Sequence, residues 1–101
     1  MTKRLDLTGA DFRHGSLDDH SFTRCDLGGA NFQSASLRNA HFAGCDLRGA
    51  DFRWADLRGA RFTRVLTHRA DVGRTDLTGA RWEGARLGGV TFEDVIDEPR
   101  A

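Results

Sequence analysis

Several features that define common protein classes are scarce in this sequence. Two cysteines among 101 residues are too few for a disulfide framework or a four-ligand zinc site. No apolar run exceeds three residues, which argues against a transmembrane helix or a secretory signal segment. Fifteen Lys and Arg balance fifteen Asp and Glu, so no net charge draws the chain to DNA or anionic lipid. We therefore expect no membrane association, no direct nucleic-acid binding and a cytoplasmic location.

Proline and tyrosine are also scarce, at one and zero residues, whereas there are seven Phe and twelve Gly. This imbalance reflects a five-residue repeat. Every fifth residue from Leu7 to Phe92 is Leu, Phe or Trp in sixteen of eighteen positions. Two positions before these large residues stands a small residue, usually Ala, and the residue between them is usually polar. The chain is therefore a tandem array of short, similar units.

The five-residue period fits neither an α-helix nor a long strand. A small–polar–large triplet fits a short strand whose two apolar side chains point the same way. The two residues that follow often include Gly, as at Gly49 and Gly59, which is typical of a turn. A chain that turns after every short strand with one side inward winds into a β-solenoid. Because Leu and Phe alternate, each coil must have an even number of sides.

Residues 45–52, Cys-Asp-Leu-Arg-Gly-Ala-Asp-Phe, resemble the A(D/N)LxX consensus of the pentapeptide-repeat family, and the resemblance covers residues 5–96. The family implies an all-β fold, a right-handed quadrilateral parallel β-helix with twenty residues per coil. This chain then forms a single domain of about 4.5–5 coils. We expect residues 1–4 to be a lead-in, residues 5–96 to be the β-helix and residues 97–101 to be a C-terminal tail.

Twenty residues per coil sort the large residues into four sides. The first side is centred on Leu7, Leu27, Leu47, Thr67 and Leu87. The second side is centred on Phe12, Phe32, Phe52, Val72 and Phe92. The third side is centred on Leu17, Leu37, Leu57 and Leu77. The fourth side is centred on Phe22, Phe42, Phe62 and Trp82.

The pentad at residues 65–69 breaks the pattern, because Thr67 takes the large position and Leu66 the polar one. One interpretation is a local bulge or a re-aimed side. The other is that Leu66 is exposed in a contact surface. His20 takes a small inward position, where we expect a hydrogen-bonded core residue. Cys25 and Cys45 are one coil apart and are expected as buried thiols, with a disulfide as the alternative.

The sequence offers little for catalysis. The four His residues fall in different repeat positions, which does not favour a shared metal site. No insertion interrupts the pentads to build a pocket, and the glycines follow the five-residue period rather than a phosphate-binding motif. We therefore expect no enzyme activity, no catalytic residues, no metal and no cofactor.

Surface residues are the remaining candidates for function. Outward-facing Asp residues form a candidate acidic ladder, which either accepts turn N–H groups and pairs with nearby Arg or imitates DNA phosphates. Its members are Asp6, Asp26 and Asp46 on the first side and Asp11, Asp51 and Asp71 on the second. The candidate partner-binding residues are an outward tryptophan, arginines of the fourth side and its corner, and an outward leucine: Trp54, Arg61, Arg81, Arg24, Arg64 and Leu66.

The ends of a solenoid expose core and strand edges, which are capped or paired. The resemblance implies pairing of two copies through the C-terminal coil, since some family members dimerise there. The candidate dimer interface consists of Trp82, Phe92, Val95 and Ile96.

These observations favour a non-catalytic, rigid protein–protein interaction module whose partner is an unidentified protein. The family resemblance adds an alternative, a DNA mimic that binds DNA gyrase or topoisomerase IV and protects it from topoisomerase poisons. Such mimics are expected to be acidic and longer, whereas this chain is neutral and short. A second alternative is a designed or truncated repeat scaffold without a specific ligand.

Overall fold

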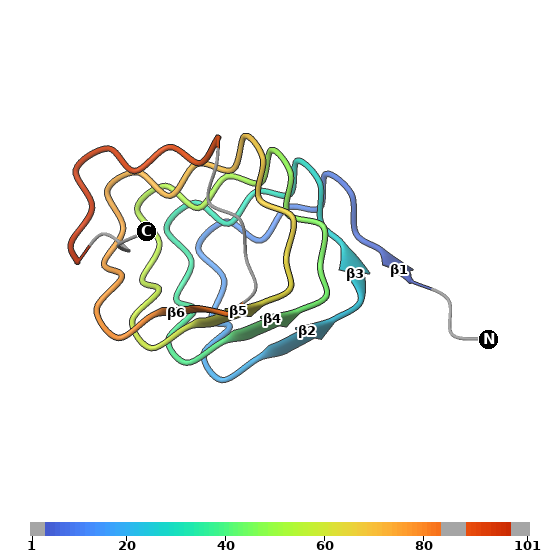
Figure 1. Cartoon of the computed structure of the whole chain (residues 1–101), viewed down its shortest axis with the longest axis horizontal. Coiled ribbons are helices and arrows are strands. Elements are labelled where there is room, and N and C mark those ends of the chain that lie inside the picture. The colour runs from blue at the N-terminus through green and yellow to red at the C-terminus, as the bar shows by residue number, and fades with distance from the viewer. Residues whose placement is uncertain (1–3, 84–88, 98–101) are drawn as a thin grey trace.

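The computed structural model describes residues 4–83 and 89–97, which form a stack of coils (Figure 1). Two parallel sheets run along the stack, one of order β1-β3 and one of order β2-β4-β5-β6. The strands are β1 (Leu5–Asp6), β2 (Ser21–Thr23), β3 (Cys25–Asp26), β4 (His41–Ala43), β5 (Arg61–Thr63) and β6 (Arg81–Glu83). Further bridges between single residues extend the pairing to the other sides. The part of the chain that is described contains no helix long and apolar enough to cross a membrane.

All strand pairing joins residues that are twenty positions apart. Phe22 pairs with Phe42 and Phe42 with Phe62 in the larger sheet, and single bridges join Asp11 to Asn31 and Asn31 to Asp51. Backbone hydrogen bonds of 2.7–3.2 Å connect successive coils along every side. The chain is therefore an all-β parallel β-helix, as the repeat predicts.

The corners of the coil are not all alike. On the first three sides, the N–H of the small residue usually donates to the carbonyl of the large residue three positions before it, as from Ala50 to Leu47 at 3.0 Å. This turn needs a positive φ at Gly49, which has +72°. On the fourth side no such bond follows β2, β4 or β5, and the strands there are three residues long. The corner after the fourth side therefore differs from the others in its hydrogen bonding.

The interior is filled by stacked rings and alternating aliphatic side chains. Phe42 stacks on Phe22 and Phe62 with ring centroids 4.9 and 5.1 Å apart, and Phe32 stacks on Phe52 at 4.7 Å. Rings on adjacent sides meet edge to face, as Phe32 and Phe42 do at 5.7 Å. The predicted core is confirmed for the middle coils, whose fully buried large residues are Phe32, Phe42, Phe52, Phe62, Leu27, Leu37, Leu47, Leu57 and Leu77. Towards the two ends the large residues are partly buried, as Leu7 and Phe92 are, and Leu87 lies outside the described residues.

Two interpretations of irregular positions are wrong, and both concern local packing. No bulge occurs at residues 65–69, because Leu66 keeps its place in the ladder opposite Asp46 and Thr67 is buried in the large position. Leu66 therefore points outward and is 54% exposed. His20 is also exposed rather than buried, with its ring 4.6 Å from that of Phe22. Later coils hold alanine at its position, where an imidazole does not fit.

The two cysteines are buried and free, as predicted. The Sγ of Cys45 donates to the carbonyl oxygen of Phe22 at 3.1 Å. Burial raises the pKa of the Cys45 thiol to about 11. Both residues therefore act as small apolar side chains in a stacked column that also contains Leu5 and Val65.

Candidate functional site

The outward Asp residues are held by the turns that follow them. Asp46 Oδ1 accepts the backbone N–H of Arg48 at 3.0 Å, and the guanidinium of Arg48 closes a bidentate pair with distances of 2.9 and 2.7 Å. The same two-residue arrangement joins Asp11 to Arg13, Asp51 to Arg53 and Asp56 to Arg58.

Other carboxylates are neutralised from neighbouring coils. Arg4 Nε lies 2.6 Å from Asp26, and Arg38 Nη2 lies 2.7 Å from Asp18, twenty residues away. Among the candidate ladder residues, Asp6 is held by Thr8 rather than by an arginine, with the Thr8 N–H 3.0 Å from its carboxylate. The ladder is therefore a set of local ion pairs and not a continuous negative stripe.

The Asp–Arg ion pairs make the stability of the fold depend on pH. Hydrogen bonds from Arg13 and Arg38 lower the pKa values of Asp11 and Asp18 to about 2. A carboxyl group whose pKa is lower in the folded state than in the unfolded state stabilises the fold at pH values above its unfolded pKa of about 3.9. This contribution is lost as the pH falls towards the folded-state pKa of about 2. We expect the urea midpoint to fall between pH 5 and pH 2, and to fall less in Asp11→Asn. An unchanged midpoint in wild type would contradict this.

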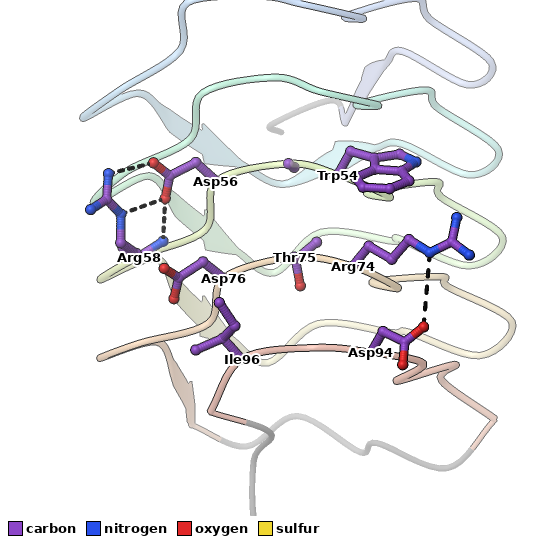
Figure 2. Close-up of a pocket in the computed structure, with 9 residues that line it drawn as sticks. Trp54, Asp56, Arg58, Arg74, Thr75, Asp76, Asp94 and Ile96 are labelled. Atoms are coloured by element: carbon purple, nitrogen blue, oxygen red, sulfur yellow. Dashed lines mark hydrogen bonds and ion pairs between the residues drawn. The ribbon is translucent and has the colours of Figure 1, made fainter.

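A shallow groove crosses the third side of the β-helix near its C-terminal end (Figure 2). It has a volume of about 590 Å³. One wall is a column of residues twenty apart, Trp54, Arg74 and Asp94, and the other wall contains Asp56, Asp76 and Ile96 (Figure 2). The floor is the outer surface of the coil at Ala55 and Thr75. We call this feature the third-side groove.

The indole of Trp54 is presented to solvent at the rim of the third-side groove. Trp54 is 59% exposed and sits at a turn with φ of +67°. The guanidinium carbon of Arg74 lies 4.8 Å from the ring centroid, a cation–π contact, and Arg74 Nε is 3.9 Å from Asp94. Ile96, 58% exposed, adds a second apolar side chain to the same groove.

The structure separates the other predicted partner-binding residues. Leu66 is exposed on the first side, away from the residues that line the third-side groove. Arg61 and Arg81 are register partners on the outer face of the fourth side, and Arg24 and Arg64 follow its strands at the corner. The groove residues Asp76 and Asp94 were not among the predicted site residues, although their register with Asp56 and Trp54, at multiples of twenty residues, was a signal for them.

The candidate dimer interface has partly buried and exposed members. Trp82, Phe92 and Val95 pack against the core as partly buried side chains, whereas Ile96 is exposed. Trp82 stacks on Phe62 with centroids 4.0 Å apart. Pairing of two copies through these residues stays a prediction.

The described part of the chain offers no evident site for an ion. It contains no group of three or more His, Cys, Asp or Glu side chains that could hold a metal. A second hollow of about 540 Å³ lies on the first side, and it is lined by polar residues and glycine: Asp6, Thr8, Asp26, Gly28, Asp46 and Arg48.

Comparisons with known proteins agree with this architecture. A model of pentapeptide repeats matches residues 25–64 as eight copies. A pentapeptide repeat protein from the thylakoid lumen of Arabidopsis thaliana is 37% identical over 96% of this chain and 69% of its own length, with a TM-score of 0.60. No curated protein matches the sequence.

Two other solved structures are similar. A trypsin-treated variant of QnrB1, described as a plasmid-mediated fluoroquinolone resistance protein, is 27% identical over 84% of this chain, with a TM-score of 0.58. The chain spans only 56% of the length of that structure. A pentapeptide repeat protein from Nostoc PCC 7120 is 24% identical over 95% of this chain and 78% of its own length, with a TM-score of 0.60, which shows a likeness of fold alone.

Proposed function

Because the chain belongs to the pentapeptide-repeat family, we propose that it is a rigid, non-catalytic module that binds another protein through the third-side groove. The observation that carries this proposal is the exposed Trp54 at the groove rim, paired there with Arg74. Large aromatic side chains beside a concave surface are the usual anchors of protein interfaces.

Contacts within the chain favour the position of the indole at the groove rim. Arg74 lies over one part of the ring, and the backbone on both sides of Trp54 is hydrogen-bonded into the coil, with Trp54 N donating to Gly73 O at 3.1 Å. A partner therefore loses little free energy in ordering this side chain.

The groove also indicates what kind of segment would fit. Trp54 and Ile96 provide apolar contact at its two walls. Between them, the Asp76 carboxylate accepts hydrogen bonds from Thr78, while the nearby Arg58 guanidinium is bound to Asp56 at 2.7 Å and attracts Asp76 from further away. A protein segment with an apolar side chain next to a Lys or Arg would satisfy both features.

Trp54→Ala is expected to weaken partner binding about 30-fold or more, since truncating an anchor tryptophan costs about 2 kcal/mol or more. Partners are captured on immobilised wild type, and each is then purified and titrated by calorimetry. Leu66→Ala is the matched control, because Leu66 is similarly exposed on a different side. A partner that Trp54→Ala retains fully, or that Leu66→Ala loses equally, would overturn the proposal.

A fluorescence titration tests the same contact directly. The chain contains two tryptophans, and Trp82 belongs to a column that is otherwise phenylalanine. Trp82→Phe therefore leaves Trp54 as the only indole with little change to the core. Emission of Trp54 is expected to shift to shorter wavelength when the partner covers it.

Binding of a type II topoisomerase by DNA mimicry is a second candidate, supported by the similarity to QnrB1. The charge arrangement counts against it, because the outward carboxylates are paired with arginines and the net charge is zero. A gyrase supercoiling assay with a fluoroquinolone decides between the two. Protection of the enzyme by this chain would favour mimicry, and lack of protection at molar excess would favour the interaction module.

We propose the cytoplasm as the compartment of this module. Cys25 and Cys45 are neighbours on successive coils and both thiols are free. A reducing compartment keeps such thiols unpaired.

A further inference from the structure

The fourth side differs from the other three in its charge. On the first three sides the outward position before the large residue is usually Asp, Asn or Ser, and the Asp residues meet an Arg or a turn N–H. On the fourth side the same position holds Ser21, His41, Arg61 and Arg81. Arg24 and Arg64 occupy the adjacent corner, one after β2 and one after β5.

Few carboxylates lie close enough to these arginines to balance their positive charge. Within residues 4–83 and 89–97, Arg24, Arg64 and Arg81 form no ion pair, and Arg61 reaches only Glu83, at 4.0 Å. By contrast, Arg48 and Arg58 hold their carboxylates at 2.7 Å on other sides. Positive charge is thus left unpaired on one side of a molecule whose net charge is zero.

The arginines of the fourth side repel one another, and a bound anion would relieve this repulsion. Arg61 and Arg81 are direct partners in the parallel ladder between β5 and β6, so their backbones are about 4.8 Å apart. Like charges at this spacing repel each other. Between the two arginine columns lie the short side chains Thr23, Ala43 and Thr63, and Glu83 follows them in the same column at the C-terminal end.

We propose that the fourth side binds an acidic protein segment, an extended stretch rich in Asp and Glu that lies along the stack between the two arginine columns. Charge complementarity supports this occupant, because four arginines share this side and its corner with a single described carboxylate within 4.0 Å of any of them, that of Glu83. A long nucleic acid fits less well, since the chain has no net positive charge. The fourth side is distinct from the third-side groove, so each proposal can fail without the other.

The test uses a fluorescein-labelled peptide of twelve residues, mostly Glu, titrated with the whole protein and followed by fluorescence anisotropy. Arg61→Gln/Arg81→Gln is expected to weaken binding about fivefold or more, because two ion pairs are lost. Arg13→Gln/Arg53→Gln is the charge-matched control on the opposite, second side and is expected to change binding less than about twofold. Circular dichroism of each variant verifies that it is folded.

Several results would overturn the proposal. Equal loss in the two double variants would mean that only net charge matters. Absence of binding by wild type at low salt would mean that the fourth side does not take an acidic segment. Tighter binding of a single-stranded oligonucleotide with the same dependence on Arg61 and Arg81 would assign the side to nucleic acid instead. Trp54→Ala is expected to leave peptide affinity unchanged, which separates this result from that of the third-side groove.

Discussion

Phe42→Ala is expected to lower the free energy of unfolding by about 3–5 kcal/mol, the range for emptying a buried phenylalanine site. Phe42 is fully buried, stacks on Phe22 and Phe62, and meets Phe32 and Phe52 edge to face at 5.7 and 5.6 Å. Hydrogen bonds between coils hold the backbone at a fixed spacing, so the cavity cannot close easily. Since small domains are stable by about 5–15 kcal/mol, the variant is close to unfolding.

Chemical denaturation followed by circular dichroism measures this loss. Phe12→Ala is the control, because Phe12 lies at the N-terminal end of the same ring array and is only partly buried. We expect Phe12→Ala to cost clearly less than Phe42→Ala. Equal costs at the two positions would mean that stacking on both sides adds nothing to the stability of Phe42.

Exchanging one Leu and one Phe within a coil, as Leu47→Phe/Phe52→Leu, is expected to cost about 3 kcal/mol or more, although composition is unchanged. Leu47 lies in the column of the first side and Phe52 in the ring column of the second side. The exchange removes the stack of Phe52 on Phe32 at 4.7 Å and its edge contact with Phe62 at 6.2 Å. It also forces a ring between the tightly packed neighbours of Leu47, which is fully buried.

Comparing the stability of the double variant with that of Phe52→Leu alone separates two effects. One is the matching of side chains within a stacked column, and the other is the total volume of the core. The single variant loses the ring without overfilling the first side. We expect the double variant to be the less stable of the two in the same denaturation experiment. A midpoint that rises when Leu47→Phe is added would show that total volume, and not the matching of rings in a column, determines the stability of the core.

The periodic part of the molecule could be predicted from the sequence because one local rule places every residue. Small–polar–large triplets at a spacing of five residues predict that Ala50 and Phe52 point inward and that Asp51 points outward. In the structure Ala50 and Phe52 are buried and Asp51 is partly exposed. The pairing of Asp51 with Arg53 also followed, since both belong to one turn. Such features depend only on neighbours within a pentad.

Features that depend on contacts between coils were harder to predict. His20 was assigned to the core from its position alone, but a histidine is too large for a place that holds Ala40 in the next coil. The pair of Asp18 with Arg38 joins residues twenty apart and was not predicted. The contact of Trp54 with Arg74 was missed for the same reason. The corner after the fourth side also differs in its turn hydrogen bonds, which five-residue patterns do not distinguish.

The twenty-residue register has a consequence for how this chain can change in length. Insertion of twenty residues adds one layer, and each later residue still lies above its own column. Insertion of five residues turns everything after it by one side, which sets Phe rings above Leu and the arginines of the fourth side above the aspartates of the first. Only additions of whole coils therefore preserve the four surfaces. Each surface then lengthens along the axis with its own chemistry, independently of the other three.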